Sequence, residues 1–133
     1  MLIEDALVAT FARWNAEPFA WGQHDDCMMS VFRHCWLVTG RDAGNEWRGT
    51  YHDENSALRV LAAAGGGLAG MDKGLVGIGL ERTLSPNRGD PVCARIGTHE
   101  IGGIYLGDMT AFRMEGRGRM DIAVKHIGAW HLC

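Results

Sequence analysis

The sequence predicts one α+β domain over residues 1–133, with helices first and an antiparallel sheet second. Two observations lead to this expectation. Apolar residues recur at helical spacing within about residues 1–80, and short runs of β-formers between glycine-rich turns fill about residues 88–132. Because helices and strands are grouped along the chain and do not alternate, we expect an antiparallel sheet packed against helices.

Four helices are expected in the first part of the chain, over about residues 2–13, 26–38, 56–64 and 68–75. In the first, Leu2, Ala6 and Phe11 recur on one face. For the third, Asn55 or Ser56 is the predicted N-cap. The fourth is short and contains glycine, which disfavours a helix interior.

Five strands are expected after a turn at residues 88–91, over residues 92–96, 100–106, 109–114, 120–126 and 129–132. Each is a short run of apolar or β-branched residues, bounded by glycine or charged turn residues. Short strands in direct succession are typical of an antiparallel meander.

Composition and charge narrow the functional classes. The net charge of -3 gives no general electrostatic attraction to nucleic acid or to an anionic membrane, and no apolar run is long enough for membrane insertion. The N-terminus carries the acidic residues Glu4 and Asp5 and lacks the basic residues that begin a secretory signal peptide, so we expect synthesis in a cytoplasm. The four cysteines form no C-x-x-C pair and are expected to be free thiols, and no cofactor is expected.

The residues around Cys27 organise the chain. Asp25 or Asp26 is expected to cap the helix that follows, so Cys27 lies in its first turn. Free backbone N–H groups and the helix dipole favour a thiolate at such a position. Cys27 is therefore a candidate nucleophile, while a buried structural cysteine is the alternative.

At two places the residues resemble the NlpC/p60 group of papain-like cysteine peptidases. Trp21-Gly22 with Asp26-Cys27 resembles the segment before that group's nucleophile helix. Residues 88–92 and 103–107 resemble its glycine-aspartate strand start and its glycine-isoleucine-tyrosine-leucine-glycine strand. The resemblance implies a papain-like fold, with a catalytic cysteine at Cys27.

The whole chain is most similar to a small branch encoded in tailed phages and prophages. Its pattern reads here as Trp21-Gly22, Asp26-Cys27, Thr39-Gly40, Arg48-Gly49 with Tyr51, Gly65-Gly66, Gly89-Asp90 and Ala129-Trp130. The resemblance implies a component of the virion tail, at the tail tip or baseplate. Its implied partners are other phage tail proteins and peptidoglycan.

The resemblance also exposes a departure. Where the peptidase group has its catalytic histidine, this sequence has Ile101. His99 and His24 are the candidate replacements as the partner of Cys27, and His126 is a candidate for the group that orients that partner. Two interpretations stay open: a structural domain with reduced or no activity, or a peptidoglycan endopeptidase that uses Cys27 during DNA entry.

A metal site is a rival arrangement for the same residues. His24 and Cys27 have H-x-x-C spacing, and Cys93, His99 or His52 would have to complete the ligand set. Zinc sites usually combine two short spacings, and one is present here. No metal is therefore predicted.

Overall fold

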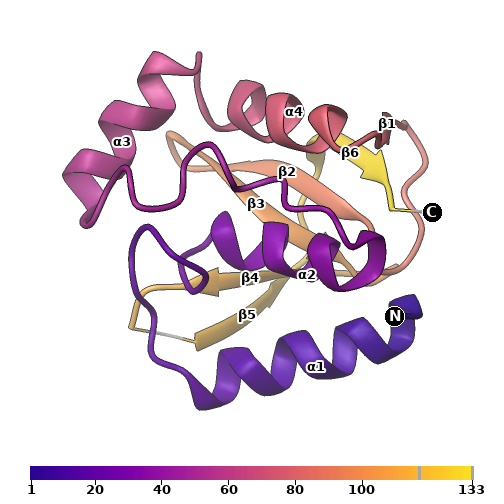
Figure 1. Cartoon of the computed structure of the whole chain (residues 1–133). Coiled ribbons are helices and arrows are strands. Elements are labelled where there is room, and N and C mark those ends of the chain that lie inside the picture. The colour runs from indigo at the N-terminus through magenta and orange to yellow at the C-terminus, as the bar shows by residue number, and fades with distance from the viewer. Residues whose placement is uncertain (117, 133) are drawn as a thin grey trace.

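Four helices pack on a six-stranded antiparallel sheet in the computed structural model, which describes residues 1–116 and 118–132 (Figure 1). The helices are α1 (Ile3–Ala16), α2 (Met29–Thr39), α3 (Glu54–Ala63) and α4 (Gly67–Gly77). The strands are β1 (Glu81–Arg82), β2 (Pro91–Ile96), β3 (His99–Tyr105), β4 (Thr110–Met114), β5 (Gly118–Ile122) and β6 (His126–His131). The predicted α+β class is confirmed.

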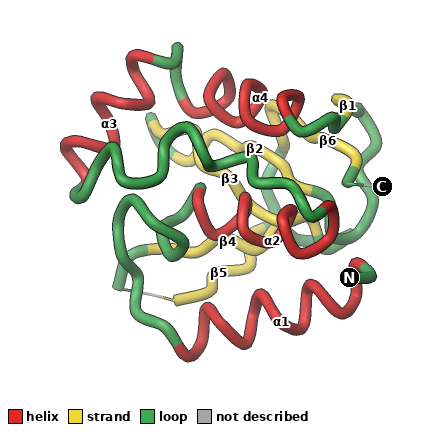
Figure 2. The backbone as a smooth tube through the Cα atoms, in the orientation of Figure 1, coloured by secondary structure: helices red, strands yellow, loops and turns green. Residues whose placement is uncertain are grey.

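The strand order is β1-β6-β2-β3-β4-β5, so the last strand inserts between β1 and β2. Helices α2 and α4 pack on one face of the sheet, while α1 lies against α2 and β5 (Figure 1). The loop from α2 to α3 runs back between α2 and α4 (Figure 2). None of the described helices has both the length and the apolar character needed to cross a membrane.

Two predicted details are corrected by the structure. The N-cap of α3 is Asp53, whose carboxylate accepts the Ser56 amide, whereas Asn55 lies inside the helix. The sheet also begins earlier than predicted, because Glu81 and Arg82 pair with His131 and Trp130. Two residues are too few to show a periodicity of their own, so the sequence pattern missed this strand.

The two faces of the sheet pack against different side chains, and two adjacent glycines of β3 identify each face. A Cβ added at Gly102 would lie 3.0 Å from the sulfur of Met71 in α4 and 3.8 Å from Val31 in α2. A Cβ added at Gly103 would lie 2.8 Å from Phe112 on β4. Successive strand residues point to opposite faces, so Gly102 marks the face toward the helices and Gly103 the opposite face.

Candidate functional site

Asp26 caps the turn that leads into α2. Its Oδ1 accepts the amides of Met28 at 3.0 Å and Met29 at 2.7 Å, and its carbonyl accepts the amide of Ser30 at 3.1 Å. Cys27 therefore lies in the turn that precedes α2, two residues before the helix begins at Met29, whereas the sequence predicted it inside the first turn of the helix. Of the two expected caps, Asp26 takes the role because its side chain turns back toward the free amides.

The second carboxylate oxygen of Asp26 holds the preceding loop. It accepts the Gly22 amide at 2.9 Å and the Tyr51 hydroxyl at 2.5 Å. Gly22 has a φ of +90°, and a Cβ there would lie 1.9 Å from the carbonyl oxygen of Tyr51. The tryptophan-glycine and aspartate-cysteine motifs thus form one hydrogen-bonded unit with the residue 51 loop. Sequence reasoning missed the bond from Tyr51, although Tyr51 belongs to the resemblance pattern.

Asp25 serves a different purpose from Asp26. It accepts two hydrogen bonds from Arg13 on α1, at 2.9 and 2.8 Å, and one from Arg113 on β4 at 2.6 Å. Arg113 is 1% exposed and also donates to the carbonyl of Glu17. Burial raises the pKa of Asp25, but the two arginines outweigh that effect and hold the pKa below its ordinary value. Asp25 therefore anchors the Cys27 loop to α1 and the sheet.

A small apolar cavity of about 30 Å³ lies beside Cys27. Its walls are aromatic and aliphatic side chains, among them Trp21, Trp47, Tyr51 and Leu61. A water molecule needs roughly 10–15 Å³ of such space, so the cavity has room for water-sized occupants and not for a peptide.

The Cys27 thiol is protonated at neutral pH. Burial, followed by the nearby negative charge of Asp26, raises the pKa of Cys27 to about 12. Hydrogen bonding from the Met28 amide opposes this rise but is the smaller effect. The carboxylate that positions Cys27 thus also disfavours its ionisation.

Two of the three candidate imidazoles lie on the other side of the sheet from Cys27. In the sheet register, Ile101 and His126 both pair with Ala94, and His99 pairs with Ile96. These residues share the face of Gly103, whereas α2 packs on the face of Gly102. The structure therefore does not bring His99 or His126 to Cys27, and Ile101 points away from the nucleophile helix as well.

His126 has partners of its own on that opposite face. Its Nε2 is 3.0 Å from the Thr110 hydroxyl, and its ring packs edge-on against Tyr105. Burial lowers the pKa of His126, so the imidazole is neutral at pH 7.

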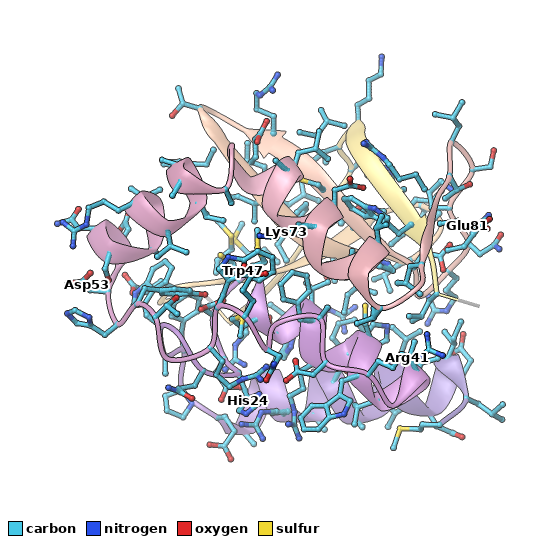
Figure 3. All side chains as sticks on the ribbon, turned by 45° about the horizontal axis from the view of Figure 1, so that its top comes forward. His24, Arg41, Trp47, Asp53, Lys73 and Glu81 are labelled. Carbon is cyan, nitrogen blue, oxygen red and sulfur yellow. The ribbon has the colours of Figure 1, made fainter. Side chains whose placement is uncertain are left out.

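His24 lies beside the start of α2 but is turned toward Trp36. The two rings stack with centroids 6.2 Å apart, and Figure 3 shows the labelled His24 away from Trp47, which lines the cavity. Its Nδ1 is buried without a hydrogen-bond partner in the described chain. Burial and then the charge of Arg48 lower the pKa of His24. No hydrogen bond joins His24 to Cys27 among the described residues.

His34, in the middle of α2, has a structural role. It is buried, its Nε2 donates to the Gly89 carbonyl at 2.9 Å, and its Nδ1 lies 3.1 Å from the Thr10 hydroxyl. Burial lowers the pKa of His34, so the neutral ring accepts the Thr10 proton. Among the described residues, no group of three or more His, Cys, Asp or Glu side chains is arranged to hold a metal ion.

Three further resemblance motifs also stabilise the fold. Asp90 is buried and accepts the amides of Asn87 and Leu132. Buried Trp130 donates its indole N–H to Asp72 on α4 at 3.0 Å. Gly40 ends α2 with a φ of +72°. These motif positions are accounted for by packing and hydrogen bonding.

Comparison with protein families matches residues 2–132 to a family described as a domain of unknown function, DUF6950. In the comparisons with curated proteins and with solved structures, nothing matches the chain. Because the family match covers nearly the whole sequence, this chain belongs to the DUF6950 family.

Proposed function

We propose that this domain is a structural component of a tailed-phage particle, at the tail tip or baseplate, with an NlpC/p60-like arrangement and no working catalytic pair. It is made in the host bacterial cytoplasm and joins the virion through other tail proteins. The resemblance to the phage-encoded branch supports the assignment to a particle. The separation of Cys27 from His99 and His126 supports the proposal that the domain has no working catalytic pair.

The chemistry of the thiol supports the same proposal. A cysteine peptidase needs a thiolate, an imidazole within hydrogen-bond reach and a group that orients the imidazole. The pKa of Cys27 is raised to about 12, and the charged group near its thiol is the carboxylate of Asp26, whereas a thiolate would be stabilised by a cation. The motifs around it make hydrogen bonds that stabilise the loop. The domain therefore uses the cysteine-bearing helix as part of its scaffold.

The decisive experiment incubates the purified chain and its Cys27→Ala variant with peptidoglycan and measures released peptides by mass spectrometry. We expect no product from either protein. Release by the wild type that is lost in Cys27→Ala would overturn the non-catalytic proposal. For the particle assignment, we expect the chain in purified virions, and its absence there would count against that assignment.

The alternative is a peptidoglycan endopeptidase that uses Cys27 to hydrolyse wall peptides during DNA entry. The surroundings of Cys27 favour it: Cys27 lies in the turn before α2, is partly exposed and borders a cavity. His24 is then the imidazole nearest in sequence, and it would have to leave Trp36 to act. Loss of wall hydrolysis in His24→Ala and Cys27→Ala alike would support this alternative.

A further inference from the structure

Strand β5 forms one end of the sheet, and its outer edge is unpaired. Its five residues pair with β4 in consecutive register, from Gly118 with Met114 to Ile122 with Thr110, without a shift. In the described chain no strand lies beyond β5 (Figure 1), and no backbone hydrogen bond outside this ladder involves residues 118–122. Because backbone groups alternate between the two edges of a regular strand, alternate residues of β5 direct an N–H and a C=O away from β4.

Helix α1 lies beside β5 and leaves this edge accessible. The guanidinium of Arg119 packs over the ring of Phe11 at 3.9 Å, and a hollow of about 360 Å³ borders this contact and Asn15. Gly118, Arg119 and Asp121 are exposed, and glycine can expose only backbone atoms. The α1 contact therefore holds the side chain of Arg119 in place without burying the strand.

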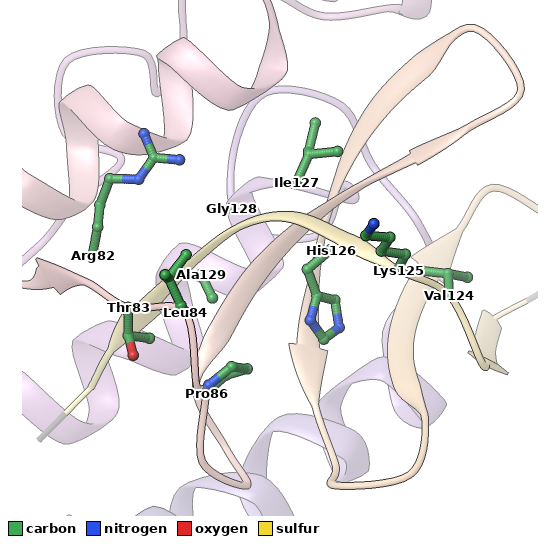
Figure 4. Close-up of a pocket in the computed structure, with 10 residues that line it drawn as sticks. All are labelled: Arg82, Thr83, Leu84, Pro86, Val124, Lys125, His126, Ile127, Gly128 and Ala129. Atoms are coloured by element: carbon green, nitrogen blue, oxygen red, sulfur yellow. The ribbon is translucent and has the colours of Figure 1, made fainter.

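The opposite end of the sheet is different. There β1 is two residues long and lies beside a hollow of about 580 Å³, lined by residues 82–84, 86 and 124–129 (Figure 4). The pairing of β6 with β2 also shifts between Cys93 and Ala94. Of the two terminal strands, β5 therefore has the longer and more regular edge.

The charges of β5 are self-complementary about its central residue. Arg119 and Asp121 lie on either side of Met120 and bind each other at 2.8 and 2.9 Å. In an antiparallel pair centred on Met120, Arg119 of each copy faces Asp121 of the other, whereas a pair centred on Arg119 or Asp121 places like charges opposite each other. Unlike charges stabilise such a pair and like charges destabilise it. Arg119 uses Nε and Nη2 within its own chain, so Nη1 is left for the second copy.

We propose that β5 pairs with β5 of a second copy of this chain, antiparallel and centred on Met120, and so joins two sheets edge to edge in a two-fold symmetric dimer. A strand edge recognises another strand through main-chain hydrogen bonds, and the charges select the register. Proteins often protect an open edge with lysine or proline, and β5 contains neither. The interface is small, so we expect a dissociation constant in the roughly micromolar range. The inference is independent of Cys27 and of the assignment to a phage particle.

Analytical ultracentrifugation of the full chain tests the dimer with two charge variants. Arg119→Asp and Asp121→Arg each place like charges at both cross-strand pairs, so each variant should dimerise about thirtyfold more weakly than the wild type. An equimolar mixture of the two should form a heterodimer of wild-type strength, because every pair then joins opposite charges again. Arg95→Asp breaks an exposed pair with Glu100 elsewhere on the sheet and should leave dimerisation unchanged. Thermal unfolding checks that each variant is folded.

Hydrogen exchange supplies the backbone readout. Amide exchange at residues 118–122 should slow as the wild-type concentration rises through the dissociation constant, while exchange at residues 99–105 of β3 stays unchanged. A wild-type chain that stays monomeric up to about 1 mM would overturn the proposal. A dimer that both charge variants form as tightly as the wild type would also overturn it, as would a mixture of the folded variants that stays monomeric.

Discussion

At the scale of single residues, the properties of Cys27 follow from the atoms around its sulfur. The first turn of a helix favours a thiolate. Here burial and the adjacent Asp26 carboxylate act against that preference and raise the pKa of Cys27 to about 12. The local sequence gave the position of the cysteine, but its environment decides its protonation.

Alkylation measures this environment directly. At pH 8 we expect iodoacetamide to modify Cys27 on the order of a thousandfold more slowly than an ordinary free cysteine, because few molecules carry the thiolate. The rate should keep rising through pH 9–11. Mass spectrometry of the peptide containing Cys27 gives the rate, and the urea-unfolded chain is the control. A rate that levels off below pH 8 would contradict the expectation.

The Tyr51 hydroxyl is the second residue-scale feature. It donates to the buried carboxylate of Asp26, so Tyr51→Phe should lower the free energy of unfolding by about 2 kcal/mol. Tyr105→Phe is the matched control, since its exposed hydroxyl donates to the Gly107 carbonyl and its loss should cost less than about 1 kcal/mol. Urea unfolding of both variants measures the difference. Equal losses would show that the bond from Tyr51 to Asp26 contributes no more to stability than the exposed bond from Tyr105.

At the scale of elements, β3 contains two adjacent glycines because both of its faces are closely covered. Met71 of α4 approaches Gly102 on one face, and Thr110 and Phe112 approach Gly103 on the other. A Cβ at Gly103 would lie 2.9 Å from the backbone oxygen of Ala111, so that position has no room for a side chain, and one at Gly102 would require Met71 to shift. The close approach explains why glycines appear where strand propensity would disfavour them.

Substituting one of these glycines tests the close approach. Gly103→Ala would place a Cβ 2.7 Å from Thr110 and 2.9 Å from the Ala111 carbonyl, so we expect a loss of roughly 1–3 kcal/mol in stability. Gly77→Ala, at the end of α4, meets no atom within 4 Å and should gain up to about 1 kcal/mol. Thermal unfolding compares the two, and a neutral Gly103→Ala would contradict the packing argument.

At the scale of the whole molecule, a buried charged cluster joins segments that are far apart in the sequence. Asp25 of the Cys27 loop receives Arg13 from α1 and Arg113 from β4. Arg113 also binds the carbonyl of Glu17 at the end of α1. The cluster therefore fixes the Cys27 loop relative to both the first helix and the sheet.

Removing one member of the cluster should be costly. Arg113→Ala removes the buried partner of Asp25 and its bond to the Glu17 carbonyl, and we expect a loss of about 3–5 kcal/mol. Lys73→Ala breaks an exposed pair with Glu46 and should cost less than about 1 kcal/mol. Denaturant unfolding gives both values. Similar small losses would mean that the cluster does not anchor the loop.

The sequence alone determined the α+β class, the four helices and the position of Cys27 close to the start of the second helix. These features depend on local periodicity, glycine and capping residues, which act between near neighbours in the chain. The bounds moved by a few residues, and the cap of α3 moved to Asp53, because neighbouring polar residues compete for the same role.

Tertiary structure alone decided the face of the sheet on which each histidine lies, the partners of Asp25 and the high pKa of Cys27. The first two depend on residues distant in sequence, because Ala94 sets the face of His126 and Arg113 reaches Asp25. The pKa of Cys27 depends on burial by the fold, together with the adjacent Asp26. Side chains alternate along a strand, so His99 lies on the same face of β3 as Ile101, two residues later. Only the pairing of β3 with β2 shows whether that face is the one on which α2 packs. A motif can therefore place a cysteine at a helix start, while its reactivity depends on the groups that the fold brings to it.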